Sequence, residues 1–180
     1  LRDYWNNQNS LVDTDRDLVH LFSKRNNTGT GGIAFLNGVN SAWNGYGFSS
    51  NLTDAAQYIN LPAPYFFWNI YCVMHEIGHN FGAKHTQWCG WPEGPIDNCV
   101  NIEEVFADEC ANYTNNPNPQ VGTIMSYCHM WPAQSGGGII MKFHETVKES
   151  ILLYMSQQDL SDCNNTDIIG CLDENACNYD

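Results

Sequence analysis

Eleven consecutive residues constrain this chain more than any other part of its sequence. They fit the pattern H-E-x-x-H-x-x-G-x-x-H at every fixed position and read His75-Glu76-Ile77-Gly78-His79-Asn80-Phe81-Gly82-Ala83-Lys84-His85. Since His75 and His79 are four residues apart, a helix would present both rings on one face, about one turn apart. Gly82 can adopt the positive φ that ends a helix and turns the chain back, which lets His85 reach the same point.

The residue types of this motif match the chemistry of a zinc site. Zn²⁺ prefers nitrogen and sulfur donors in a tetrahedral shell, and neutral imidazoles supply the nitrogen. We therefore predict that His75, His79 and His85 bind Zn²⁺ as the cofactor, which leaves Glu76 free to act as general base toward a zinc-activated water. Two alternatives stay open. The histidines can share a helix face without a metal, or a zinc ion can serve structure alone, although structural sites are usually closed by a fourth protein ligand.

The motif and a second segment together resemble the metzincin metallopeptidases. The second segment is Gly122-Thr123-Ile124-Met125-Ser126-Tyr127-Cys128, and it is similar to the Met-turn of that family. The resemblance implies that Met125 packs beneath the three zinc-bound imidazoles and that Gly82 forms the turn after the helix. It also implies the activity, a secreted endopeptidase that hydrolyses peptide bonds of extended protein substrates with Glu76 as general base.

Within the metzincins, the closest likeness is to the adamalysin/reprolysin group. The runs Leu18–Ser23 and Gly31–Leu36 are similar to that group's central and edge strands. An extended peptide would add to such an edge strand through main-chain hydrogen bonds. The resemblance assigns this substrate strand to Gly32, Ile33, Ala34 and Phe35.

Two positions depart from the pattern of that group. Thr86 follows the third histidine, where the adamalysins usually have Asp. Tyr127 lies two residues after Met125, as in astacins and serralysins, in which this tyrosine can bind the zinc and stabilise the oxyanion. Two interpretations of Tyr127 stay open: a catalytic role, and a tyrosine that packs in the turn with its hydroxyl on the backbone.

The resemblance implies an α+β fold, a metzincin-like catalytic domain with a mixed twisted sheet, an active-site helix and a C-terminal helix. Strand signals occur near residues 18–24, 32–37 and 45–50, and a closing helix is expected over residues 139–158. The zinc helix is expected to bury a broad apolar surface made of Phe66, Phe67, Ile70, Val73, Met74, Ile77 and Phe81. We expect the N-terminal part of the upper lobe to be lacking from this chain, either as a separate fragment of a nicked chain or because the domain is a minimal variant, with residues 1–8 as a surface-helix remnant.

The chain divides into two expected parts. Residues 1–160 are the N-terminally incomplete peptidase domain, and residues 161–180 are a truncated repeat rich in Cys, Asp and Asn. Such repeats are seen at the ends of some secreted bacterial proteins. The Asp and Asn side chains could bind Ca²⁺ through oxygen ligands, and the alternative is a solvated tail held by disulfides.

Charge and cysteine content limit the environment and the partners. The net charge is −13 with 7 Lys and Arg residues, so no basic patch is available for nucleic acid or an anionic membrane, and no apolar run is long enough to span a bilayer. Eight cysteines favour disulfides in an oxidising compartment and thus a secreted protein. The expected partners are protein or peptide substrates and a cleaved N-terminal fragment or pro-segment. We expect pairing among Cys89, Cys99, Cys110 and Cys128, and between Cys72 and Cys163.

Three further functional classes are compatible with parts of the sequence. One is a structural interaction module, in which the terminal repeat would be the functional part and the zinc domain would only carry it. In a gluzincin-type peptidase, Glu103 or Glu104 would replace His85 as the third ligand. In a catalytically silent zinc-containing binding or adhesion module, the zinc fold would carry only a recognition surface, although an intact Glu76 argues against this. The acidic cluster is interpreted as a solvated face and consists of Glu103, Glu104, Asp108 and Glu109.

Overall fold

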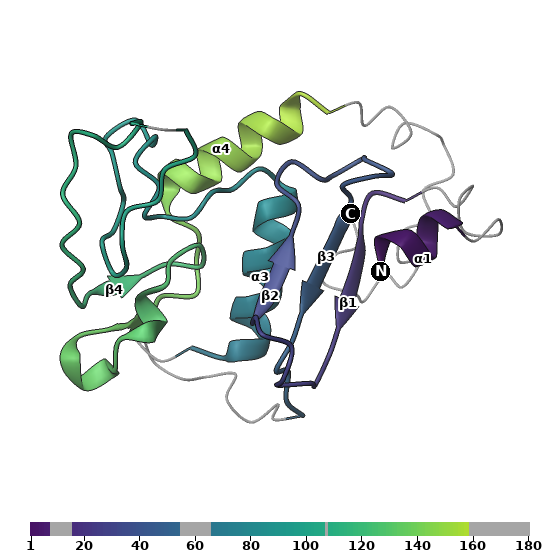
Figure 1. Cartoon of the computed structure of the whole chain (residues 1–180), viewed down its shortest axis with the longest axis horizontal. Helices are drawn as coiled ribbons and strands as arrows, with labels where there is room; N and C mark the ends of the chain where they lie inside the picture. Colours follow the sequence, from purple (N-terminus) through teal and green to yellow (C-terminus); the bar gives the residue numbers. More distant parts are fainter. Residues whose placement is uncertain (8–15, 55–65, 107, 159–180) are drawn as a thin grey trace, which may run out of the picture.

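The computed structural model describes residues 1–7, 16–54, 66–106 and 108–158. Within these ranges the elements are α1 (Arg2–Asn7), β1 (Val19–Phe22), β2 (Gly32–Ala34), β3 (Tyr46–Ser49), α3 (Trp68–Asn80), β4 (Val121–Gly122), two 3₁₀ turns (Cys128–Met130 and Ala133–Ser135), β5 (Gly138–Ile139) and α4 (Glu145–Ser156). Helix α3 stands between the sheet formed by β1, β2 and β3 and an irregular lobe formed by residues 86–135 (Figure 1). The described part therefore has the α+β fold that the sequence predicts.

The sheet is mixed, as expected. β3 lies in the centre, with β1 parallel and β2 antiparallel to it, and the register aligns Leu21 with Phe48 and Phe48 with Ile33. Because side chains alternate between the faces of a sheet, these three residues share the face turned away from α3. The opposite face contacts the helix, where Asn80 Nδ2 donates a hydrogen bond to the backbone oxygen of Tyr46 at 3.2 Å.

Helix α3 carries the first two histidines and ends just before the predicted turn. Gly82 has a φ of +85°, and the chain reverses there, with Ala83 N donating to Gly78 O at 2.9 Å. The predicted apolar surface is wrong in part, because Ile70 and Met74 are 45% and 37% exposed. The helix instead buries the face that meets the sheet and the irregular lobe, and this face is largely polar because it builds the site. Its buried residues are Tyr71, Cys72, His75, Glu76, Gly78 and Asn80.

Two disulfides tie the irregular lobe together. They are Cys89–Cys110 and Cys99–Cys128, which confirms the expected pairing among these four cysteines. Cys72 is buried and forms no disulfide with another described cysteine. Its predicted partner, Cys163, lies outside the described residues, so that pairing stays a prediction.

The C-terminal helix is shorter than the sequence predicts. A helix is expected over residues 139–158, but α4 begins at Glu145, because β5 occupies the expected start and pairs in parallel with β4. His144 caps the helix by accepting a hydrogen bond from Thr146 N at 3.3 Å. Helix α4 contributes Val147 to a buried cluster that also includes Ala83 of the zinc motif. The cluster consists of Ala83, Trp91, Ile124, Met125 and Val147.

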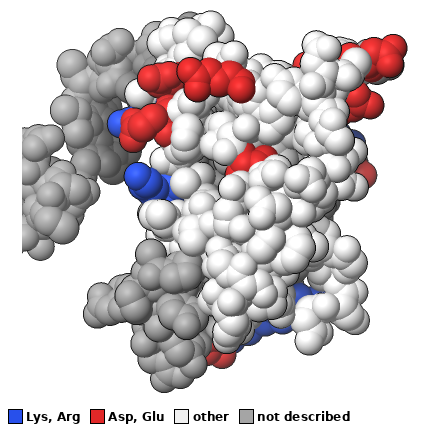
Figure 2. Space-filling model, turned by 90° about the vertical axis from the view of Figure 1, so that its left-hand side faces the viewer, with Lys and Arg blue, Asp and Glu red and all other residues white. Residues whose placement is uncertain are grey.

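None of the described helices combines the length and the apolar character needed to cross a bilayer. The face of the molecule in Figure 2 carries acidic side chains in separate groups and few basic ones, with uncharged residues between them. On that face, electrostatic attraction favours cationic over anionic partners.

Candidate active site

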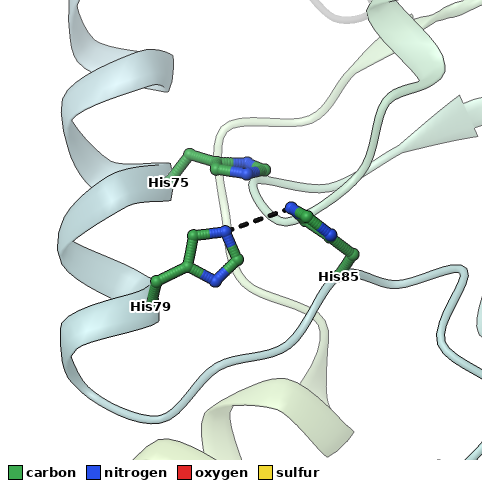
Figure 3. Close-up of side chains that lie close together, drawn as sticks. All are labelled: His75, His79 and His85. Atoms are coloured by element: carbon green, nitrogen blue, oxygen red, sulfur yellow. Dashed lines mark hydrogen bonds between the residues drawn. The ribbon is translucent and has the colours of Figure 1, made fainter. Parts of the chain in front are cut away.

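Three histidines converge beside helix α3 (Figure 3). His75 and His79 project from successive turns of the helix, and His85 reaches them from the segment that returns after Gly82. One ring nitrogen from each histidine lies within 4.8 Å of the other two, and the Nε2 atoms of His79 and His85 are 3.1 Å apart. The structure thus brings the predicted ligands together at one point.

The other nitrogen of each ring is held by a hydrogen-bond acceptor. The Nδ1 atoms of His75, His79 and His85 lie 2.8, 2.7 and 2.6 Å from Ile124 O, Ala83 O and Glu103 Oε2, respectively. Carbonyl and carboxylate oxygens accept hydrogen bonds, so each Nδ1 carries the ring proton and each Nε2 presents a lone pair.

This arrangement fits a divalent cation. The lone pairs of His79 Nε2 and His85 Nε2 face each other at 3.1 Å, which is repulsive unless a positive charge lies between them. Three unprotonated imidazole nitrogens form a donor set that Zn²⁺ accepts in sites that keep one position open. Ring N–H groups tied to carbonyl or carboxylate oxygens are also the usual surroundings of metal-bound histidines. The residues present therefore fit the zinc ion that the sequence implies.

Burial keeps His75 and His79 in the form that binds metal. It lowers the pKa of His75 well below the usual value, with further lowering by the neighbouring His79 and His85. The pKa of His79 falls to about 4, again mainly through burial and then through His85. Both imidazoles are therefore neutral at neutral pH, as metal ligation requires.

Met125 packs against helix α3 at Gly78, which lies between His75 and His79. Its side chain is fully buried, and a Cβ atom at Gly78 would lie 2.7 Å from its Sδ atom. Thr86 ties this turn to the zinc motif, since its backbone N and its Oγ1 both donate to Met125 O, at 3.0 and 3.2 Å. A buried threonine thus secures the segment of the third histidine at the position where adamalysins usually have Asp.

Glu76 extends from helix α3 toward the edge strand β2. Its carboxylate packs directly on Gly32, so closely that a side chain at that position would overlap it. Burial raises the pKa of the Glu76 carboxyl group to about 8. A cation at the adjacent imidazoles would favour the ionised form, because a nearby opposite charge lowers the pKa of a carboxyl group.

Tyr127 points its hydroxyl into the same site. Its oxygen lies 3.0 Å from His85 Nε2, and its ring stacks on His75 with centroids 5.6 Å apart. Burial, followed by the carboxylates of Glu76 and Glu103, raises the pKa of Tyr127 to about 12. The hydroxyl therefore keeps its proton at neutral pH and can donate a hydrogen bond within the site.

The histidine cluster opens into a cleft of about 320 Å³. Glu76, His79, His85 and Tyr127 line it together with Gly32, Ile33 and Ala34 of β2 and with Glu103 and Val105 of the irregular lobe. Of the predicted substrate strand, Phe35 lies outside this lining and instead borders a separate apolar hollow with Leu1 and Arg2.

Glu103 belongs to the site, although its sequence context does not predict this. The interpretation of the acidic cluster as a solvated face is wrong for this residue, because its Oε2 accepts hydrogen bonds from His85 Nδ1 (2.6 Å) and Gln87 Nε2 (3.1 Å). The hydrogen bond from His85 lowers the pKa of Glu103. The tendency of metal-bound imidazoles to donate their second N–H to a carboxylate could have suggested an acidic partner. Spacing alone does not select one member of the acidic cluster.

Two other groups of potential metal ligands occur in the described ranges, and both contain disulfide-bonded cysteines. They are Cys89, Glu109 and Cys110, and Asp97, Cys99 and Cys128. Cysteine binds zinc as a thiolate, which a disulfide does not provide. Among the groups found in the described ranges, the histidine cluster is therefore the one that suits zinc.

A helix with paired histidines lies beside a mixed sheet, and a third histidine returns to close the cluster, as the resemblance to metallopeptidases predicts. Residues 2–86 of the chain match the family model described as Metallo-peptidase family M12B Reprolysin-like. The match spans β1, β2, β3 and α3 and ends one residue after His85. Over this segment, just under half of the chain, the protein is similar to the reprolysin-like metallopeptidases that its motifs resemble. No curated protein matches the chain.

Proposed function

We propose that this protein is a secreted zinc endopeptidase that hydrolyses peptide bonds of extended protein substrates. The observation that carries the proposal is the convergence of His75, His79 and His85, each with Nδ1 bonded to an acceptor and Nε2 turned inward. When bound, Zn²⁺ supplies a Lewis acid that polarises a water molecule and the scissile carbonyl. The reprolysin-like match supports the same class of enzyme.

Two residues of the cleft have roles in the proposed reaction. Glu76 takes a proton from the attacking water and returns it to the amine of the leaving peptide. Tyr127 donates a hydrogen bond to the oxygen of the scissile carbonyl as negative charge develops there. Both side chains line the same cleft as His79 and His85, which supports a shared function.

Within the described ranges no strand pairs with the outer edge of β2, which offers a place for the backbone of the substrate. Gly31 O and Phe35 N both bond to the segment of β3, with N···O distances of 2.7 and 3.3 Å. In an antiparallel strand the hydrogen-bonding groups alternate, so the N–H and C=O groups of Gly32 and Ala34 point away from β3. Gly32 O accepts a hydrogen bond from Thr30 Oγ1 at 2.6 Å, which a substrate N–H would have to replace. An extended peptide that adds to this edge would cross the site along its length, which favours an endopeptidase.

The disulfides support the proposed location, and the domain limits are part of the proposal. Disulfides persist in oxidising compartments, so the two bonds of the irregular lobe support an extracellular protein. The proposal assigns the peptidase domain to residues 1–160. The predicted repeat of residues 161–180 and its predicted Ca²⁺ ligands lie outside the described residues.

The deciding experiment compares hydrolysis of casein by the wild type and by Glu76→Gln at equal zinc content. The amide preserves the size of the side chain but cannot accept a proton, so we expect a loss of at least about 10²-fold in kcat. Glu104→Gln changes an exposed carboxylate near the cleft and serves as the matched control with full activity. A zinc chelator should abolish cleavage by both active proteins, and added zinc should restore it.

Two results would contradict the proposal. Cleavage by Glu76→Gln at the wild-type rate would remove Glu76 from the reaction. Zinc binding without cleavage by the wild type would favour the catalytically silent binding module instead.

A further inference from the structure

We propose that Glu103 is a positioning residue that fixes the tautomer and the orientation of His85 for metal binding. The inference rests on the proposed zinc function, and it concerns the residue that makes the third imidazole available. Glu103 stands 18 residues away from His85 in the chain and outside the zinc motif. Two sets of contacts support this role: the hydrogen bond from His85 to the Glu103 carboxylate, and the bonds that hold Glu103 to the segment around Gln87.

The contact with His85 is short and directional. His85 Nδ1 donates to Glu103 Oε2 at 2.6 Å, slightly shorter than the usual charge-assisted hydrogen bond from nitrogen to a carboxylate (about 2.7–2.9 Å). The other ring nitrogen, Nε2, lies 3.1 Å from His79 Nε2. Glu103 therefore holds the ring from the side opposite to the proposed metal, which is the place of a supporting residue and not of a third ligand.

His85 needs such support more than the other two histidines. His75 and His79 are fixed by a continuous helix, and their Nδ1 atoms bond to backbone carbonyl oxygens. His85 lies in the returning segment after Gly82, and its Nδ1 partner is a side-chain carboxylate. A carboxylate partner orients the ring and increases the basicity of the opposite nitrogen, and both effects strengthen metal binding.

Glu103 is itself held in place by the segment that follows His85. Its backbone N donates to Gln87 O and its backbone O accepts from Cys89 N, both at 3.1 Å. Its Oε2 also accepts from Gln87 Nε2 at 3.1 Å. The disulfide between Cys89 and Cys110 closes the loop that carries Glu103. Backbone, side chain and disulfide thus fix the carboxylate behind the ring without any contribution from a metal.

The test measures zinc affinity by competition with a chromophoric chelator, so it does not depend on peptidase activity. We expect Glu103→Ala to bind zinc about 10- to 100-fold more weakly than the wild type. Glu103→Gln retains an oxygen that can accept from Nδ1–H, so it should recover part of that loss. Glu104→Ala removes the adjacent exposed carboxylate and should bind zinc like the wild type.

A second measurement separates positioning of His85 from a general effect on the fold. In zinc-loaded protein labelled with ¹⁵N-histidine, the Nδ1–H proton of His85 should be visible by NMR as a slowly exchanging, downfield signal. The signal should persist in Glu103→Gln and Glu104→Ala and disappear or move upfield in Glu103→Ala, while the corresponding signals of His75 and His79 stay unchanged.

Equal zinc affinities of Glu103→Ala and Glu104→Ala would overturn the assignment. An unchanged His85 signal in Glu103→Ala would also overturn it. If the wild type itself bound no zinc, the proposed function would fail with it, whereas tight wild-type binding that is insensitive to Glu103 would refute the positioning role alone.

Discussion

The carboxylate of Glu76 lies on the backbone of Gly32, and the absence of a side chain at Gly32 is what makes room for it. A Cβ atom built on Gly32 would lie 2.6 Å from both Cγ and Cδ of Glu76. Gly32 belongs to β2 and pairs with Ser49 of β3, so the strand cannot move away without breaking the sheet. The glycine therefore couples the edge strand to the position of the proposed general base.

We expect Gly32→Ala to displace Glu76 and to reduce casein hydrolysis by at least about 10²-fold, the usual contribution of a general base. Zinc content should stay at the wild-type value, because the atoms nearest to the new Cβ all belong to Glu76 and not to a proposed ligand. Leu21→Val is the control, since Leu21 is 45% exposed on the sheet face turned away from α3 and lies outside the lining of the cleft, and it should remain active. An active Gly32→Ala enzyme would mean that the position of Glu76 tolerates this displacement.

Gly78→Ala should destabilise the protein although the substitution lies within a helix. Alanine normally stabilises a helix relative to glycine by about 0.5–1 kcal/mol. Here the new Cβ would lie 2.7 Å from Met125 Sδ and 3.2 Å from Phe143 Cε1, and overpacking of a buried site costs about 1–3 kcal/mol. Urea unfolding should therefore give a lower free energy of unfolding for Gly78→Ala. In combination with Met125→Leu, which removes the sulfur from this contact, the cost should be smaller than the sum of the two single changes.

Tyr127→Phe should separate catalysis from metal binding. The ring can still stack on His75, while the hydroxyl 3.0 Å from His85 Nε2 is lost. If the hydroxyl donates to the developing oxyanion, kcat should fall by about 10²- to 10³-fold with little change in KM or zinc content. Tyr113→Phe, at a tyrosine that is 41% exposed, is the control. Full activity of Tyr127→Phe would leave the tyrosine with a packing role.

The histidine cluster can be predicted from sequence because its geometry is local. A spacing of four residues places His75 and His79 on one helix face, and a glycine at position 82 permits the turn that brings His85 back. The strands near residues 18–24, 32–37 and 45–50 are similarly predictable from β-forming residues between turn signals.

The features that sequence reasoning missed depend on contacts between distant segments. Glu103 meets His85 within a loop that the Cys89–Cys110 disulfide closes, and neither hydrophobic periodicity nor spacing encodes that contact. Ile70 is exposed for a similar reason. The buried face of α3 carries site residues such as His75 and Glu76, and the most hydrophobic face of the helix is therefore not the buried one.

Acid sensitivity of the fold should originate partly from a histidine outside the site. His20 Nε2 forms a hydrogen bond of 2.9 Å with Ser49 Oγ, while its Nδ1 is buried without a hydrogen-bond partner among the described residues. Burial lowers the pKa of His20 in the folded state below its ordinary value of 6.5. The unfolded chain then binds the proton more readily, so the stabilising contribution of neutral His20 is complete above about pH 6.5 and is lost as the pH falls below it.

We therefore expect His20→Gln to flatten the acid side of the stability profile. Glutamine retains an N–H group that can bond to Ser49 but does not titrate. Chemical unfolding of metal-free protein between pH 7.5 and pH 5 (roughly the range in which histidines titrate) should show a smaller loss of stability for the variant than for the wild type. The buried histidines of the site are present in both proteins and contribute equally, so the difference isolates His20. Parallel pH profiles of the two proteins would contradict the prediction, because they would mean that folding does not change the proton affinity of His20.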